Sequence, residues 1–217
     1  MTKAIPRLQP RKKRQNLSGN ATLVIVEGQT EEKYFSDLSN YHRNLSTFVL
    51  RGQGTDPVSL VEYAAKLYNT GRQGNSRQQR ASAKCFPAKL FDKIFIVFDE
   101  DEKPEQRKKA LDAIKSFNKR NKSVKMTACD SRPNFELWLL LHHEPLQPRP
   151  YGIADIQKKL CKHMQNYSKA MDGLFAVFHG KTETAIKNSE SLRNNKDRDE
   201  GDCFTNVDVL VKYCQQN

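Results

Sequence analysis

Three carboxylates follow two apolar segments that are typical of buried strands. Glu27 comes directly after the run at residues 22–26, and Asp99 and Asp101 follow the run at residues 94–98. Residues two apart in an extended segment point to the same side, so Asp99 and Asp101 are predicted to direct their carboxylates at one point. Glu27 adds a third carboxylate from the end of another strand. Oxygen ligands of this kind suit Mg²⁺ or Mn²⁺, which keep several waters and take substrate phosphates.

The mutual repulsion of these carboxylates favours a bound metal. Clustered acids raise one another's pKa unless a cation compensates for their charge. A metal held by Glu27, Asp99 and Asp101 would polarise a phosphoryl group, activate a water and stabilise the leaving oxygen. Alternatively, one carboxylate stays free as a general acid or base, and Glu27 is the candidate for that role. Acids after a strand can also serve solvation alone, but Glu27-Gly28 at the end of a second strand favours a functional site.

A very apolar segment at residues 135–142 predicts a buried helix, opened by Ser131 or Asn134. Glu136 is unusual there, because a carboxylate among apolar side chains is costly to bury without a partner. We therefore expect Glu136 to face the metal site, an arginine or a helix terminus and count it among the catalytic candidates. An ordinary exposed helix face is the alternative. His142 is expected to be a hydrogen-bonded residue at the helix end.

Positive charge is concentrated at the N-terminus. The net charge is +12, and half of this excess lies within residues 1–20, which contain no acid. A basic arm suits a polyanionic partner, because each neutralised phosphate releases counterions. A solvated tail that aids solubility is the alternative. The predicted nucleic-acid contacts are Arg11, Lys12, Lys13, Arg14 and, further along the chain, Lys169.

The pattern of the remaining chain predicts an α/β fold. Apolar runs at residues 22–26, 48–50, 94–98 and 124–128 are expected strands. Helical patterns are expected from residue 31 and at residues 58–68, 106–118, 135–142, 153–165, 179–194 and 206–213. This alternation predicts a mainly parallel sheet with helices on both faces. Sites in such sheets lie at the carboxyl ends of strands, where Glu27 and Asp99 fall.

Three regions are expected along the chain. Residues 1–20 form a disordered basic arm, residues 21–130 an α/β core, and residues 131–217 a mainly helical part packed on that core. Residues 70–84, which are polar and basic, are expected to form a surface loop. Five cysteines without a Cys-x-x-Cys pair argue against a zinc ribbon or a disulfide framework. No apolar run approaches the roughly 20 residues of a membrane helix, so a soluble, cytoplasmic protein without a membrane partner is expected.

Several motifs together resemble the RloB-like family of the Toprim superfamily. Residues 27–35 match Glu-Gly-x-Thr-Glu-x-x-Tyr-Phe, residues 99–101 match Asp-x-Asp, and residues 131–142 match Ser-Asn-Pro-x-Phe-Glu-x-Trp-Leu-Leu-Leu-His except at Arg132. A Tyr-x-Lys element ends at Lys169. Asp208 stands where the family's C-terminal motif usually has His, which leaves the role of that position open. The resemblance extends over residues 11–213.

The resemblance implies a Toprim-like sheet and a divalent-metal-dependent endonuclease that hydrolyses phosphodiester bonds. It further implies an effector of bacterial anti-phage abortive infection, acting on DNA or RNA, tRNA included, and paired with an ABC-type ATPase. Primases and topoisomerases of this superfamily need further domains, so hydrolysis is the preferred activity.

Two other functions stay open at this point. One is a non-catalytic nucleic-acid-binding or adaptor subunit of a partner ATPase, and the other is a different phosphoryl-transfer enzyme. The sequence does not choose between DNA and RNA, or between one metal and two. It also leaves open whether the chain forms a homo-oligomer and whether an ATPase is required.

Overall fold

The structure is a computed structural model that describes residues 21–42, 46–52, 54, 56–73, 91–101, 103–169 and 171–216. The predicted basic contacts Arg11, Lys12, Lys13 and Arg14 lie outside the described residues, as does most of the loop expected at residues 70–84. Helix α2 continues through the first part of that loop, as far as Gln73.

A single five-stranded sheet forms the centre of the described chain. Its strands are β1 (Ala21–Val26), β2 (Ser46–Arg51), β3 (Phe91–Asp99), β4 (Lys125–Arg132) and β5 (Phe204–Thr205), in the order β2-β1-β3-β4-β5. The first four strands are parallel, and β5 runs antiparallel to β4. The register pairs Val26 of β1 with Val97 of β3, so the two strands end at nearly the same level.

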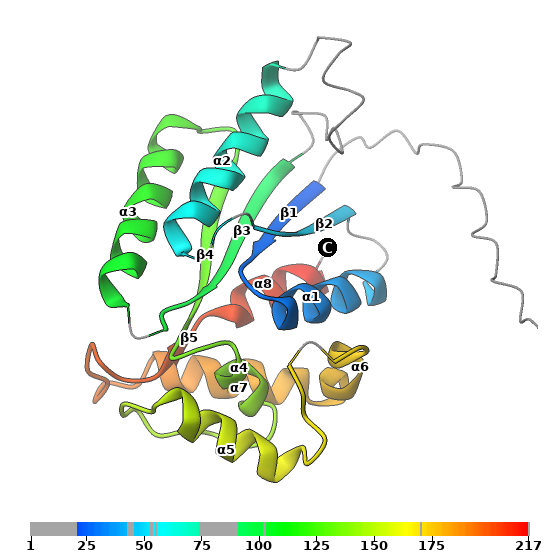
Figure 1. Cartoon of the computed structure of the whole chain (residues 1–217), viewed down its shortest axis with the longest axis vertical. Helices are drawn as coiled ribbons and strands as arrows, with labels where there is room; N and C mark the ends of the chain where they lie inside the picture. The colour runs from blue at the N-terminus through cyan, green and yellow to red at the C-terminus, as the bar shows by residue number, and fades with distance from the viewer. Residues whose placement is uncertain are drawn as a thin grey trace, which may run out of the picture.

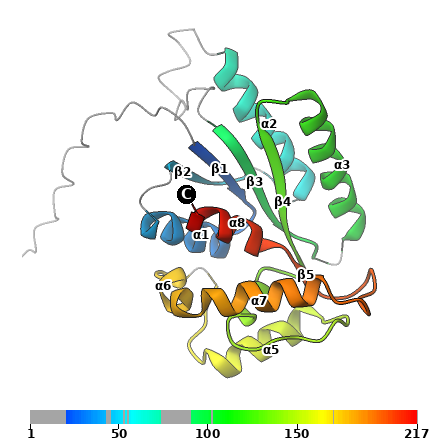
Figure 2. The same ribbon diagram turned by 180° about the vertical axis from the view of Figure 1, so that it is seen from behind.

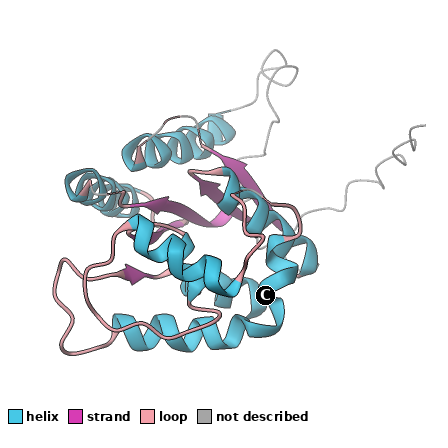
Figure 3. Ribbon diagram, turned by 60° about the horizontal axis from the view of Figure 1, so that its bottom comes forward, coloured by secondary structure: helices cyan, strands magenta, loops and turns pink. Residues whose placement is uncertain are grey.

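Helices cover both faces of this sheet. They are α1 (Gln29–Tyr41), α2 (Pro57–Gln73), α3 (Pro104–Arg120), α4 (Glu136–Leu140), α5 (Ile153–His163), α6 (Leu174–Phe178), α7 (Thr182–Arg193) and α8 (Val207–Gln216), with a short 3₁₀ turn, η2 (His179–Lys181), before α7. Helices α2 and α3 lie on one face, α1 and α8 lie on the other, and α4–α7 gather below the carboxyl ends of the strands (Figures 1 and 2). Figure 3 shows helices on both sides of the strands. The predicted α/β class, with a mainly parallel sheet and a helical C-terminal part, is confirmed.

The apolar strand sequences follow from this double coverage. On β1, Leu23 and Ile25 belong to the hydrophobic core under α2 and α3, whereas Val24 and Val26 belong to the core shared with α1, α8 and the C-terminal helices. All four side chains are fully buried. A strand buried on both faces needs a continuous apolar run rather than an alternating one. Each such side chain contributes about 1.5–3 kcal/mol on burial.

The helix predicted from residue 135 differs from expectation at its start. Helix α4 begins at Glu136, and neither Ser131 nor Asn134 caps it with a side chain. Ser131 instead lies in β4, where its Oγ is 2.9 Å from the Oγ1 of Thr205. That hydroxyl pair joins β4 to β5, a two-residue strand too short to give a periodic signal in the sequence.

Two other boundaries also shift. Helix α1 begins at Gln29 rather than at residue 31, and Gly28 occupies its N-cap position. The helix expected at residues 179–194 begins regularly only at Thr182, after the short helix α6 and the turn η2. Within the part of the chain that the structure describes, no helix has both the length and the apolar character to cross a membrane.

Asp208 takes a structural role in the C-terminal helices. Its carboxylate is fully buried at the start of α8. It accepts hydrogen bonds from Arg193 at 2.5 and 3.0 Å and from Ser189 at 2.9 Å, and it lies 3.0 Å from Lys212. Burial alone would raise the pKa of Asp208, but these bonds prevail and hold the pKa below its usual value. Asp208 therefore joins α7 to α8.

Asp208→Asn is expected to lower the free energy of unfolding by about 3 kcal/mol at pH 7, because it removes the buried partner of the half-buried Arg193. Since the folded-state pKa is below the unfolded value of 3.8, this stabilisation is complete above that value and is lost as the pH falls through the folded-state pKa. Urea unfolding at pH 7, 5 and 3 measures the difference. Asp112→Asn, an exposed site on α3, is the control and should change little. A difference between wild type and Asp208→Asn that does not shrink in acid would contradict this account.

Candidate functional site

The carboxyl ends of β1 and β3 bring the first two predicted residues together. β1 and β3 are neighbours, and the chain leaves β1 toward β2 on the opposite side, so the strand order reverses at this point. Open α/β sheets bind ligands at such a reversal. Glu27 directly follows β1, and its Oε2 accepts a hydrogen bond of 3.2 Å from the backbone N–H of Asp99, the last residue of β3. Burial is the main cause that raises the pKa of Glu27.

Asp99 is the most strongly perturbed carboxylate of this site. Its Oδ1 is buried and accepts no hydrogen bond from the described residues. Burial, followed by the charges of Glu31, Asp101, Glu136 and Glu27, raises the pKa of Asp99 well above its usual value. An unpartnered buried oxygen costs free energy, which makes Asp99 a candidate for contact with a ligand.

Asp101 reaches the site by a different geometry from the one expected. Strand β3 ends at Asp99, and Asp101 lies in a turn with a left-handed φ of 44°. Its backbone N–H donates to the carbonyl of Pro133 at 3.2 Å. The prediction that Asp99 and Asp101 point to one side of an extended segment is therefore wrong. Asp101 is exposed but close enough for its charge to raise the pKa of both Asp99 and Glu27.

The acid between them, Glu100, turns into the protein. It is buried, and Arg132 donates to both of its oxygens, at 2.8 and 2.6 Å. Arg107 lies 3.6 Å away as a second cation. Arg132 is the residue that departs from the motif at residues 131–142, and here it holds the turn that carries Asp101.

Glu136 lies at the start of α4 and close to Glu31 and Asp99, so it combines two of the environments expected for it, a helix terminus and the predicted metal site. It is only 4% exposed at the first turn of α4. The hydroxyl of Tyr167 donates to its Oε1 at 3.1 Å, and the ammonium of Lys169 lies 3.7 Å from the same oxygen. Its charge acts on both Asp99 and Glu31. Tyr167 and Lys169, which come from the segment after α5, thus accompany the acids at this site.

Glu31 is a site residue that sequence reasoning missed. It lies in the first turn of α1 and is 5% exposed. Burial, together with the charges of Glu136 and Glu27, raises its pKa to about 7. A Cβ on Gly28 would lie 2.5 Å from the Oε2 of Glu31, so glycine leaves the space that this carboxylate occupies. The spacing of four residues from Glu27 was the available signal, but it was interpreted only as an acid at a helix start.

His142, by contrast, does not join the site. It is buried, and its Nδ1 lies 2.9 Å from the carbonyl oxygen of Trp138. Burial lowers its pKa to about 3, so the ring is neutral near pH 7. The predicted role as a hydrogen-bonded residue at the helix end describes it well.

The donor set fits a divalent cation, although it is not gathered into a finished coordination shell. The carboxylate cluster consists of Glu27, Glu31, Asp99, Asp101 and Glu136, all hard oxygen donors. The buried, unpartnered Oδ1 of Asp99 is the oxygen that a cation would satisfy. In the described part of the chain, however, no three His, Cys, Asp or Glu side chains stand close enough together to hold a metal ion. Coordination here requires side-chain rotation.

Glu31→Gln is expected to stabilise the protein without metal at pH 8. The folded-state pKa of about 7 lies above the ordinary 4.5, so the contribution of Glu31 to stability is complete below 4.5 and is lost as the pH rises through 7. Removing its charge should raise the free energy of unfolding by about 1–3 kcal/mol at pH 8 and change little at pH 4. Urea unfolding in EDTA measures this.

Glu144→Gln is the matched control for this effect. Hydrogen bonds from Lys159 and His163 lower the pKa of Glu144, so its replacement should give no gain at pH 8. A Glu31→Gln variant that is less stable than wild type at pH 8 would contradict this account. It would show that the ionised Glu31 side chain does not destabilise the folded protein.

Comparison with known proteins identifies a family for this chain. The model of the family described as RloB-like protein matches residues 22–213. No curated protein and no solved structure matches the chain. The matched residues include every carboxylate of the cluster as well as Tyr167 and Lys169. The chain therefore belongs to the RloB-like protein family.

Proposed function

We propose that this protein is a divalent-metal-dependent nuclease that hydrolyses phosphodiester bonds at the carboxylate cluster. The observation that carries the proposal is the buried, unpartnered Oδ1 of Asp99 among carboxylates whose charges repel one another. Glu27, Asp99 and Asp101 would hold Mg²⁺ or Mn²⁺. Such an ion, when bound, supplies charge for the phosphoryl oxygens and an acidified water.

The other side chains of the cluster suit proton transfer and charge balance. Glu31, whose pKa burial raises to about 7 in the metal-free protein, is a second candidate for the general base beside Glu27. Tyr167 orients Glu136 through its hydrogen bond. Lys169 is largely exposed beside Glu136 and can contact a substrate phosphate, as expected for it from the sequence.

Family membership supports a wider proposal. We propose that the fold is of the Toprim type. The support is a strand followed by Glu27-Gly28 and a later strand ending at Asp99, which are elements on which that resemblance rests. The same resemblance supports a role in anti-phage abortive infection, with an ABC-type ATPase as partner and DNA or RNA, tRNA included, as substrate.

One observation favours a second function. Because the described residues contain no finished group of metal ligands, a non-catalytic nucleic-acid-binding or adaptor subunit is the alternative. That subunit would bind nucleic acid in a salt-dependent way and show no turnover with any metal.

Asp99→Asn is expected to reduce cleavage by about 10²–10³-fold, because it removes a charge that would hold the metal. The assay incubates purified protein with mixed DNA and with total RNA in Mg²⁺, Mn²⁺ or EDTA. Asp112→Asn, on the exposed face of α3, should cleave as wild type does. The same metals should raise the melting temperature of wild type but not of Asp99→Asn. Cleavage by Asp99→Asn at the wild-type rate would overturn the proposal, and metal-independent binding without cleavage would favour the adaptor.

Glu31→Gln tests the proton-transfer role separately. Wild-type cleavage should rise with pH through the pKa that Glu31 has in the metal-bound protein and then level off, because the base must be deprotonated. The charge of the bound cation places that pKa below the metal-free value of about 7. Glu31→Gln should cleave at least about tenfold more slowly and lose this dependence. An unchanged pH profile in the variant would assign the general base to another residue.

A further inference from the structure

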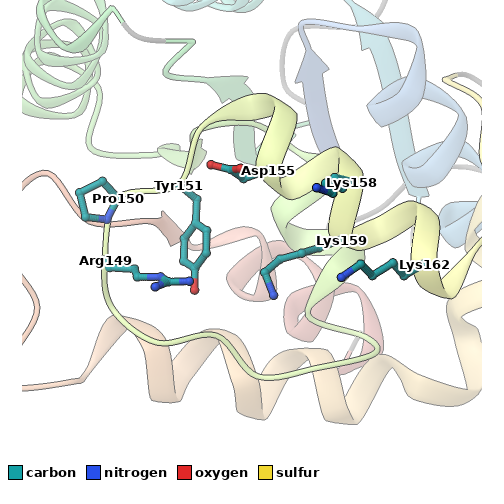
Figure 4. A pocket seen from close by; sticks show the side chains of 7 residues that line it. All are labelled: Arg149, Pro150, Tyr151, Asp155, Lys158, Lys159 and Lys162. Carbon is teal, nitrogen blue, oxygen red and sulfur yellow. The ribbon is translucent and has the colours of Figure 1, made fainter.

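A small basic pocket lies between α5 and the segment that leads into it. Its volume is about 330 Å³, at the lower end of the range for ligand sites. Figure 4 shows its lining, in which Arg149 lies against Tyr151 and the lysines extend from the helix. The lining residues are Arg149, Pro150, Tyr151, Asp155, Lys158, Lys159 and Lys162.

The acids near this pocket neutralise only part of its positive charge. Asp155 is the only acid among the lining residues, and its Oδ2 accepts a hydrogen bond of 3.2 Å from the backbone N–H of Gly152 at the helix start. Lys159 is paired with Glu144 at 2.8 Å. The remaining cations, Arg149, Lys158 and Lys162, form no ion pair with any described residue. The pocket is therefore left with a net positive charge.

The arrangement of these three cations suits a ligand with several phosphate groups. The guanidinium of Arg149 lies 4.7 Å from the centre of the Tyr151 ring, which packs against the hydrophobic core and so fixes the position of Arg149. Lys158 and Lys162 are one helical turn apart, on the same side of α5. A planar guanidinium held in place and two flexible ammonium groups are the donors that phosphate groups favour.

We propose that this pocket binds the phosphate backbone of a nucleic-acid strand and holds the substrate of the nuclease proposed above. The identity of the bound strand as a substrate rests on that proposed function. Helix α5, with 11 residues, is about 16 Å long. The segment that follows it carries Tyr167 and Lys169 to the carboxylate cluster. A strand lying along α5 would therefore reach the cluster within a few nucleotides of the pocket.

The test measures binding in EDTA, so that no cleavage is needed. A labelled single-stranded oligonucleotide is titrated with the full chain by fluorescence anisotropy at several salt concentrations. Removing the three cations by Arg149→Gln, Lys158→Gln and Lys162→Gln should weaken binding at least about tenfold. The negative slope of log K against log salt should become shallower by about 2, because each lost contact to a single strand contributes about 0.7. All three side chains are exposed, so the fold should be retained.

The matched control removes the same charge from another exposed surface. Lys108→Gln, Lys109→Gln and Lys119→Gln on α3 should change affinity less than threefold. Equal losses in both triple variants, or none in the pocket variant, would overturn the proposal. Displacement of the oligonucleotide by UMP at an equal phosphate concentration would also overturn it, since the pocket would then be a site for small phosphate compounds.

The two proposals fail separately. If Asp99→Asn abolishes cleavage while the pocket variant binds normally, the pocket assignment is wrong and the nuclease stands. If wild type cleaves nothing but binds through the pocket, binding stands and the nuclease assignment is wrong.

Discussion

Electrostatic repulsion among half-buried and buried carboxylates is the constraint on which this site depends. Glu27, Glu31, Asp99 and Glu136 come from three separate parts of the chain, and the fold keeps them together although each makes the ionised form of another more costly. The apolar core beneath them supplies the stability that this requires, because β1 and β3 are buried on both faces. A bound cation would attract each of these carboxylates and offset their repulsion. A site of this kind is therefore at its least stable when empty.

Not every acid in this region contributes to the repulsion. Glu100 and Asp208 are buried, as Glu31 and Glu136 are, but each has an arginine bonded to both of its oxygens. Asp99 has no such partner for its Oδ1. The presence or absence of a bonded arginine therefore distinguishes acids that stabilise the structure from acids that are available to a ligand. Burial alone distinguishes them less clearly. Close pairing with arginine is the feature that distinguishes the first group.

The sequence predicted what local signals encode. The strand ends at Glu27 and Asp99 could be located because a continuous apolar run and the acid after it are neighbours in the chain. The roles of Glu31 and Glu100 could not, because each depends on a partner from a distant segment: Glu136 for the first and Arg132 for the second. Helix α6 and strand β5 are too short to show a period. The expectation for Asp101 failed because one residue in a left-handed conformation ends the alternation of a strand.

The backbone at position 101 also determines how experiments there can be interpreted. Asp and Asn adopt a φ of 44° at little cost, whereas alanine would adopt it at a cost in free energy of about 1 kcal/mol or more. Alanine would thus remove the carboxylate and at the same time disturb the turn that Arg132 supports through Glu100. Asparagine retains the backbone and changes the charge alone. At this residue, an alanine scan would measure loop geometry as much as chemistry.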